Sequence, residues 1–531
     1  MQMYLIMGAI AIIVISCLIL NKLTEKTSFP TIILFLFIGI IIGNYVIPNF
    51  EYRDYTLTNN ICNIALVFTI FSGGLSCNYS ISKPVIPTAS CLATLGVFFT
   101  TIIFGYLFHL IFKIDLIYTL LLAATIGSTD ATTVFNILRK NKLNLKDNTA
   151  SILEVESGAN DPMAYTLTMI FIALIKGTNI NIPQFLLLQF LIAIIFGFLF
   201  AYLVLHLIRK IDFGSESINV ILILSFLLLT YSVTNISSGN GYLAVYLFGI
   251  YLGNNYIKDK NYIIKFFDSI TNLVLIFVFF ILGLVVHIDN MSIYFPRAIV
   301  LYLILTFVAR PIACALVCLP FKCSLEQIIF ISFAGLRGAS SICFAMLALV
   351  SLDNAIIQLF FIVVFMIVLI SILFQGLLLA PLARKLNLMD NSVDVLQTFN
   401  DYQENSDIGF IKMKVKEDNI LIGKMLKEIH FSSVRIAMII RDNMSLVPKG
   451  KTVINFGDIL ILSGDKFINK DNISFKEVFM TPTHEYCNKT ITDIHFKQNE
   501  SIVMIKREKE TIVPFGDFYI KPNDILVLAT F

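Results

Sequence analysis

The chain has 531 residues, of which 57% are hydrophobic and only 14% are charged, and its mean hydropathy is +0.83. This composition excludes a soluble globular protein and indicates an α-helical membrane protein with many spans in contact with lipid. The net charge is +3, and no tract is dense in Lys or Arg, which argues against a nucleic-acid partner.

Apolar runs of about 17 to 25 residues, long enough to cross a bilayer, occur thirteen times. They fall near 3–21, 29–48, 57–75, 87–112, 116–138, 151–175, 183–208, 217–237, 241–256, 270–288, 294–319, 326–350 and 355–383. Loops after odd-numbered spans hold fifteen Lys and Arg residues, against four after even-numbered spans. Because cytoplasmic loops hold the excess of these residues, we expect an N-terminus outside the bacterial cell membrane and a cytoplasmic tail.

The composition changes after residue 388 to an acidic linker and then to alternating apolar and polar residues with turn signals, which predict a soluble α+β tail. The tail repeats internally, since the segment from Lys424 resembles the segment from Lys489. The predicted domains are a membrane domain at 1–388, a linker at 389–407, a first repeat at 408–470 and a second, diverged repeat at 471–531.

Two spans contain polar interruptions at mid-membrane. Span five has the run GSTDATT from Gly127, which includes Asp130, and span twelve has GLRGASS from Gly335, which includes Arg337. Glycine weakens the helix, and hydroxyl groups satisfy the backbone groups that are freed. Paired interruptions predict broken, crossing helices in inverted repeats, whose half-helix ends bind substrate near the midplane. We expect Asp130 to accept hydrogen bonds from a half-helix N-terminus.

Span six places two carboxylates in the same region. Glu156 and Asn160 share a helix face, and Asp161 lies about 100° further around. A charge at the bilayer centre costs about 2.5 to 3.5 kcal/mol, so these residues predict function. Pro162 removes a helical hydrogen bond to the carbonyl of Gly158, and this loosened turn suits a partly dehydrated alkali cation.

A carboxylate that holds either one proton or one monovalent cation is the minimum machinery for exchange, and we assign this role to Asp161. We expect Glu156 to pair with Arg337 and to orient Asn160 rather than to transport. Arg310, in span eleven, either pairs with a carboxylate or extends to the interface, and the sequence leaves both open.

Five dispersed motifs carry a family resemblance. They are FSGGL at 71–75, GSTDATTVF at 127–135, ESGANDPMAY at 156–165, RP at 310–311 and GLRGAS at 335–340. They resemble the cation:proton antiporter superfamily, specifically its sodium/proton exchanger-like bacterial branch of the NhaP type. The resemblance covers essentially all of residues 1–388 and implies thirteen spans, inverted repeats and a homodimer.

The resemblance also implies roles for individual residues. Asp161 is the carboxylate shared by ion and proton, Asn160 completes the Asn-Asp pair of electroneutral exchangers, and Ser72 stands where many relatives have an acid, which leaves coordination from span three open. The predicted ion- and proton-binding residues are Asp161, Asn160, Ser157, Thr129 and Asp130, supported by Glu156 and Arg337.

The tail resembles the C-terminal lobe of regulator-of-potassium-conductance modules (RCK_C, also called TrkA-C), through a pattern of a helix, then Pro-Lys-Gly, then Gly-Asp-Ile-Leu-Ile-Leu. The resemblance implies dimerisation and a small regulatory ligand, such as a cyclic di-AMP-like nucleotide second messenger, at 408–531. The nucleotide-binding N-terminal lobe is missing, so NAD or ATP sensing is not expected.

The sequence therefore predicts a secondary antiporter, not an enzyme, which exchanges K⁺ or Na⁺ for H⁺ by alternating access without a cofactor, with K⁺ favoured. A ligand-gated potassium channel is the alternative from a different class, but no TVGYG-like filter is present. An intramembrane aspartyl hydrolase that uses Asp130 and Asp161 would leave Arg337 and the broken helices unexplained.

Overall fold

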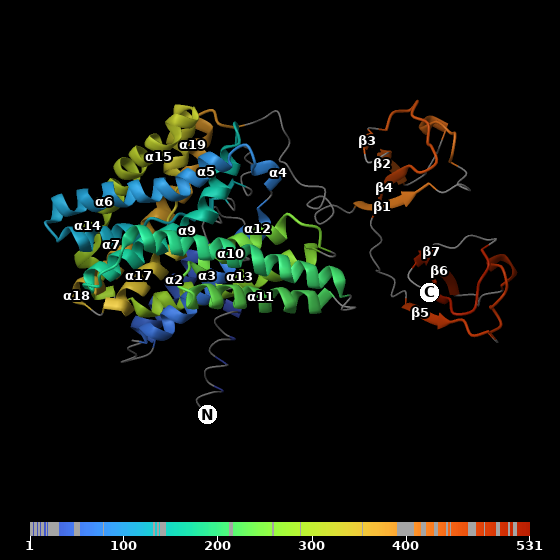
Figure 1. Cartoon of the computed structure of the whole chain (residues 1–531), viewed down its shortest axis with the longest axis horizontal. Coiled ribbons are helices and arrows are strands. Elements are labelled where there is room, and N and C mark those ends of the chain that lie inside the picture. Colours follow the sequence, from blue (N-terminus) through green and yellow to red (C-terminus); the bar gives the residue numbers. More distant parts are fainter. Residues whose placement is uncertain are drawn as a thin grey trace. The chain divides into compact units, whose positions relative to one another are not determined.

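The computed structural model divides into two units, residues 1–396 and 397–531, both drawn in Figure 1. It describes isolated positions before residue 31, then 31–46, 54–77, 79–130, 133–134, 137–138, 145–211, 216–257, 260–286, 288–352, 354–389, 408–415, 421–428, 434–441, 444–446, 448–465, 474–482, 484–494, 500–507, 510–512 and 518–530. The predicted linker, apart from residue 389, and most of the first predicted span lie outside the described residues.

The first unit is a bundle of helices. They are α2 (Thr31–Ile41), α3 (Tyr55–Ser76), α4 (Tyr79–Ser82), α5 (Ile86–Cys91), α6 (Val97–Phe112), α7 (Leu116–Thr125), α9 (Thr149–Ile175), α10 (Ile182–Lys210), α11 (Glu216–Ile236), α12 (Gly241–Gly253), α13 (Lys260–Val285), α14 (Ile288–Ile304), α15 (Arg310–Cys318), α16 (Leu325–Phe333), α17 (Ala339–Leu352), α18 (Ala355–Ile370) and α19 (Gly376–Lys385). Short π-helical turns join α5 to α6, α14 to α15 and α18 to α19.

Seven of these helical segments, among the described residues, are long and apolar enough to cross a membrane. The protein is therefore a multi-pass membrane protein. Where the structure describes them, the helices agree closely with the predicted runs, except that α14 begins at Ile288, before the run predicted from residue 294, and α13 begins at Lys260, well before the run predicted from residue 270. The first turns of α13 contain polar residues, so their hydropathy is too low for a predicted membrane span. They are still helical, because a helix needs only one apolar face to pack against its neighbours.

The two predicted interruptions are present and cross each other. Residues 126–130 leave the helical conformation after α7, and residues 334–338 do so between α16 and α17. The backbone N–H of Asp130 donates to the carbonyl of Leu336 at 2.7 Å, which joins the two segments directly. A Cβ at Gly338 would lie 2.6 Å from the Cβ of Asp130, so the crossing requires glycine.

Close helix contacts surround this crossing. A Cβ on Gly74 of α3 would lie 2.6 Å from the carbonyl oxygen of Tyr246 in α12, and one on Gly283 of α13 would lie 2.3 Å from the carbonyl oxygen of Leu36 in α2. Small residues allow backbones to approach in membranes, where packing replaces the hydrophobic effect between helices. These contacts hold α3 against α12 and α13 against α2.

The tail contains two copies of one four-stranded antiparallel sheet. The first has β1 (Ile408–Lys414), β2 (Val434–Arg441), β3 (Met444–Leu446) and β4 (Ile459–Asp465), and the second has β5 (Ser474–Phe479), β6 (Glu500–Arg507), β7 (Glu510–Ile512) and β8 (Ile525–Thr530). Their orders, β1-β4-β2-β3 and β5-β8-β6-β7, are the same. The β-bulge between Ile436 and Met438 recurs between Ile502 and Met504. The predicted internal repeat is therefore a repeat of structure.

The helix predicted in each copy is wrong for the described residues of the tail. They contain the 3₁₀ turns Leu426–Glu428 and Ile491–Asp493 but no α-helix. Gly423, with a φ of +80°, lies three residues before the first of these turns. A single turn between such a residue and a strand is too short to sustain an α-helix.

Each copy is held together by an arginine–aspartate pair between a strand and a turn. Arg441 of β2 donates to both oxygens of buried Asp458, at 2.7 and 2.8 Å. Arg507 of β6 donates to both oxygens of buried Asp524, each at 2.7 Å. The hydrogen bonds from Arg441 lower the pKa of Asp458, because a guanidinium stabilises the ionised carboxylate.

Candidate functional site

The helix α9 carries the central side chains and continues through Pro162. Asn160 is fully buried and Asp161 is 6% exposed. Gly158 allows α9 to approach α12, because a Cβ there would lie 2.7 Å from the ring of Tyr246. The turn from Gly158 to Asp161 is therefore held against a neighbouring helix while its polar side chains face the crossing.

Asp161 is bound by one serine from each interrupted segment. Ser128, after α7, donates its hydroxyl to Oδ1, and Ser340, at the start of α17, donates to Oδ2 at 3.0 Å. Since both partners are neutral hydroxyl groups, they orient the carboxylate without cancelling its charge. A hydroxyl oxygen also has lone pairs, so the same two serines can face a cation that lies beside the carboxylate.

Thr129 is held to α9 by two further hydrogen bonds. The Asn160 amide nitrogen donates to Thr129 Oγ1 at 2.5 Å, and Ser157 Oγ donates to the Thr129 carbonyl at 2.7 Å. The predicted site residues on span five and span six are thus in direct contact. The extended backbone after α7 remains against α9 because these side chains replace its missing helical bonds.

The predicted pairing of Glu156 with Arg337 is wrong. Glu156 forms its ion pair with Arg310, the first residue of α15, and both side chains are 1% exposed. Arg310 therefore pairs with a carboxylate, one of the two outcomes that the sequence left open. Two buried groups of opposite charge satisfy each other here, because neither is tolerated alone in a dry interior.

Arg337 instead satisfies the broken end of α7. Its guanidinium Nη1 donates to the carbonyls of Ile126 and Ser128, the latter at 3.0 Å, and its backbone N–H donates to Ser371 Oγ at 3.0 Å. These carbonyls lost their helical partners at the interruption, and a cation is favoured at a helix C-terminus. Arg337 thus supports the crossing itself.

Asp130 begins the chain segment after the crossing. Thr133 donates its hydroxyl to Oδ2 at 2.6 Å and its backbone N–H to Oδ1 at 3.4 Å. Asp130 therefore accepts hydrogen bonds from the residues that become helical after it. Asp130 lines the same cavity as Asp161 and Ser340.

A cavity of about 370 Å³ leads to Asp161. Its walls come from α3, α9, α13, α17 and the segment after α7, and they include the hydroxyl groups of Thr129, Ser157 and Ser340. Four carboxylates line it, those of Asp130, Glu154, Asp161 and Asp268, and none of its lining residues in the described part of the chain is basic. Such a cavity attracts cations, because low-dielectric walls concentrate the field of like charges.

Asp268 supplies a carboxylate opposite α3. Ser72 Oγ donates to Asp268 Oδ1 at 2.5 Å, which links α3 to α13 across the cavity wall. Ser72 has no charge, but its hydroxyl binds the carboxylate of Asp268 on another helix, and both residues line the cavity. Asp268 was not predicted, because it lies in the polar first half of α13, before the apolar run.

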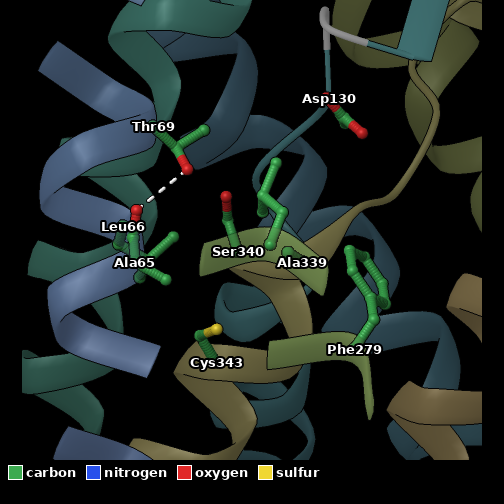
Figure 2. Close-up of a pocket in the computed structure, with 9 residues that line it drawn as sticks. Ala65, Leu66, Thr69, Asp130, Phe279, Ala339, Ser340 and Cys343 are labelled. Carbon is green, nitrogen blue, oxygen red and sulfur yellow. Dashed lines mark hydrogen bonds between the residues drawn. The ribbon is translucent and has the colours of Figure 1, made fainter. Parts of the chain in front are cut away.

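A smaller cavity of about 30 Å³ lies beyond the first, and Asp130 and Ser340 line both (Figure 2). Along α3 the large cavity reaches from Ser76 to Thr69, and the small one continues to Ala65. Its other walls include the apolar side chains of Leu66 and Phe279 (Figure 2). The polar path therefore narrows at Ser340 and ends against apolar residues.

Comparisons with known proteins agree with this arrangement. The family model described as "Sodium/hydrogen exchanger, transmembrane" matches residues 9–385, and the TrkA-C domain model matches residues 410–466 and 475–530. The chain is 32% identical over 459 residues to the K(+)/H(+) antiporter NhaP2 of Shewanella sp. (strain MR-4), covering 84% of this chain and 79% of that protein.

Two more relatives extend the comparison. The K(+)/H(+) antiporter NhaP of Alkalimonas amylolytica is 29% identical over 462 residues, covering 85% of this chain and 80% of that protein. The structure of the sodium proton antiporter MjNhaP1 from Methanocaldococcus jannaschii at pH 8 has a TM-score of 0.66 and 25% identity, covering 73% of this chain and 99% of that chain. The predicted resemblances of both the membrane domain and the tail are therefore confirmed.

Proposed function

Since this chain belongs to the sodium/hydrogen exchanger family, we propose that it exchanges K⁺ for H⁺ across a membrane, with Asp161 as the exchange site. The protein is a transporter rather than an enzyme, as predicted. One observation carries the site assignment: Asp161 lies where the acidic cavity meets the helix crossing, and its described hydrogen-bond partners are the hydroxyls of Ser128 and Ser340.

The mechanism follows from the charge of this carboxylate. When Asp161 is ionised, a monovalent cation from the cavity compensates its charge, and the oxygens of Ser128, Ser340 and Ser157 and the backbone at Thr129 replace part of the hydration shell. When Asp161 is protonated, its carboxyl group is neutral and the bound cation leaves. Because one carboxylate holds either ion but not both, each conformational cycle exchanges one cation for one proton and moves no net charge.

The choice of K⁺ over Na⁺ is supported by the names of two relatives that cover more than four-fifths of this chain, both K(+)/H(+) antiporters. Na⁺/H⁺ exchange is the alternative, since a solved structure similar to this chain is that of a sodium proton antiporter. The site offers one carboxylate with neutral oxygen ligands, which binds either ion, so selectivity depends on the spacing of those oxygens.

For the architecture we propose thirteen spans in inverted repeats, a homodimer, an external N-terminus and a cytoplasmic tail. The loops at the end of the membrane domain where Ser76 and Glu154 lie contain Lys83 and Lys146. Positive loops face the cytoplasm, so the large cavity opens inward in this conformation. The apolar residues beyond Ser340 then close the outward side.

For the tail we propose the domains stated above, 408–470 and 471–531 after a linker at 389–407, as a regulatory module that binds a small ligand. A cyclic di-AMP-like nucleotide is the candidate, and dimerisation through the tail would couple its binding to the membrane domain. The duplicated Arg–Asp pairs support two intact copies of the module.

Exchange in proteoliposomes tests the function. The purified protein, reconstituted with a trapped pH probe, should move protons when K⁺ is added, with a smaller response to Na⁺ and Li⁺, and the rate should not change with an imposed membrane potential. One uncompensated charge would instead contribute about 2.3 kcal/mol per 100 mV. Proton movement that requires no counter-cation, or single-channel currents, would contradict the proposal and favour the channel alternative.

A further inference from the structure

The residue before α12 contacts α9 at Pro162 and Thr166, just after Asp161. Asn240, the residue before α12, is fully buried. Its amide nitrogen donates to the carbonyl of Pro162 at 2.8 Å and to Thr166 Oγ1 at 2.9 Å. Neither acceptor lines the cavities described above. This contact therefore lies outside both cavities, and it begins at Pro162, the residue directly after Asp161.

Asn240 is itself fixed by groups that do not belong to α9. Its side-chain oxygen accepts the backbone N–H of Leu243 at 3.0 Å, which caps α12. Its backbone N–H donates to the carbonyl of Gln189 at 3.0 Å, and the Gln189 amide donates to the carbonyl of Ser238 at 3.1 Å. The amide thus reaches α9 from a rigid support built by α10 and α12.

Pro162 explains why α9 requires such a support. Proline has no N–H and cannot bond to the carbonyl of Gly158, so the turn that carries Asn160 and Asp161 is held by one helical bond fewer. The Thr166 hydroxyl donates to the Pro162 carbonyl at 2.8 Å, and Asn240 adds a second side-chain donor to the same atom. These two donors hold the carbonyl at the end of the proline turn, one residue after Asp161.

Aromatic packing holds the same segment in place. Tyr242, which is 1% exposed, donates its hydroxyl to Asn63 of α3 at 3.0 Å. Its ring lies 5.0 Å from that of Tyr165 on α9 and 6.2 Å from that of Phe344 on α17, measured between ring centroids. Edge-to-face contacts of this kind fix relative positions as well as bury area. The start of α12 is therefore bound to three helices that surround the site.

We infer that Asn240 is a positioning residue of the exchange: its amide fixes the Pro162 turn of α9 and thereby places the Asp161 carboxylate between Ser128 and Ser340. This inference rests on the proposed function. It assigns Asn240 no contact with the transported ion. Its loss should weaken cation binding, since the carboxylate and the serine oxygens then no longer converge, while the exchange cycle itself remains.

The test uses Asn240→Ser in the full-length protein. Serine caps a helix as well as asparagine does but is too short to reach Pro162. We expect the KM for K⁺ in proteoliposomes to rise about fivefold or more, with the maximal rate within about twofold of wild type. Asn181→Ser is the matched control, because Asn181 caps α10 in the same way, accepting from Gln184 at 3.3 Å. Its KM should not change.

A second pair of variants decides the matter if Asn240→Ser does not fold. Thr166→Val removes the hydroxyl that bonds to Pro162 and Asn240, and the KM should rise about two- to threefold. Thr168→Val removes an equally buried hydroxyl of α9 that donates to Ala164 at 2.8 Å, and the KM should stay unchanged.

An unaltered KM in folded Asn240→Ser, or equal effects of Thr166→Val and Thr168→Val, would overturn the inference alone. If Asn240 had only a structural role, Asn240→Ser would lower the thermal stability and leave the KM unchanged. That result would also overturn the inference. Wild-type protein without any exchange would instead overturn the proposed function together with this inference.

Discussion

Two carboxylates on α9 lie in contrasting surroundings. Glu156 is paired with the guanidinium of Arg310, and both side chains are buried to the same degree. Asp161, five residues further along the same helix, receives hydrogen bonds from the hydroxyls of Ser128 and Ser340 and faces an acidic cavity. One carboxylate has a permanent counter-charge, and the other has neutral partners among the described residues.

This difference separates a structural charge from a working one. A carboxylate with a fixed guanidinium partner is neutralised at all times and has no reason to take up another cation. A carboxylate held only by hydroxyl groups has no fixed counter-charge, so either a proton or a cation from solution must neutralise it. Partner chemistry, more than burial, therefore distinguishes the two roles, and four sets of variants test the comparison.

The largest expected effect is on Asp161. Asp161→Asn keeps a side chain that bonds to both serines but removes the charge, so exchange should fall at least about 100-fold, to background, while the protein still folds. Dequenching of a pH probe in everted vesicles measures the rate, and gel filtration measures folding. Asp115→Asn, at an exposed carboxylate before α7, is the control. Cation-dependent dequenching in Asp161→Asn would refute the site assignment.

Removal of Arg310 should act on folding instead. Arg310→Met leaves Glu156 as an unpaired buried charge, which costs about 3–5 kcal/mol, and the yield of folded protein should drop sharply. The double variant Glu156→Leu with Arg310→Met removes both charges and should recover both yield and exchange. Thermal unfolding in detergent measures stability. A double variant that folds but does not exchange would show that the pair takes part in exchange.

Loss of one serine hydroxyl should have a moderate effect. Ser340→Ala removes one hydrogen bond to Asp161 and one candidate ion ligand, so the KM for the cation should rise about three- to tenfold. Ser341→Ala is the control, because the fully buried Ser341 hydroxyl has no hydrogen-bond partner among the described residues. Equal KM values for the two variants would separate Ser340 from the ion site.

The smallest effect on transport is expected in the tail. Asp458→Asn breaks the pair with Arg441, whose side chain is 30% exposed, so the local cost should be about 1–2 kcal/mol. Limited proteolysis of the full-length protein should then cleave the first repeat sooner. Glu477→Gln, which breaks the exposed pair with Lys506, should change little. Identical cleavage rates for both variants would contradict this ranking.

The same pair predicts the pH dependence of the tail. Arg441 lowers the pKa of Asp458 in the folded state, so the pair contributes its stabilisation above the ordinary carboxyl range near 4. That contribution is lost as the pH falls through the lowered pKa. Proteolysis of wild type should therefore be constant between about pH 6 and 8 and increase only in strong acid.

Local sequence patterns predicted which helices carry the site, but not which side chains pair with one another in it. Polar runs located both interruptions, and helical spacing placed Glu156 and Asn160 on one face of α9. The partner of Glu156 was mispredicted because Arg310 and Arg337 are equally plausible by composition. Only the three-dimensional structure, which brings Arg310 of α15 to Glu156 of α9 from 154 positions away, decides between them.

Other contacts were missed for the same reason. The bond between Ser72 and Asp268 joins residues 196 positions apart, and Asn240 acts on α9 from 78 positions away. No periodicity in a single sequence records which surface of one helix meets which surface of another. Secondary structure is encoded locally, whereas the completion of a buried polar network depends on the whole bundle.

The backbone hydrogen bond between Asp130 and Leu336 allows the contact between the two interrupted segments to be followed by hydrogen exchange. An amide in a non-helical segment ordinarily exchanges its hydrogen for deuterium quickly, but this N–H is held at 2.7 Å by a carbonyl from the opposite segment. Its protection therefore reports whether the two interrupted segments stay joined while the protein alternates between its two faces. If that one amide remains protected throughout turnover, the crossing moves as a single rigid piece.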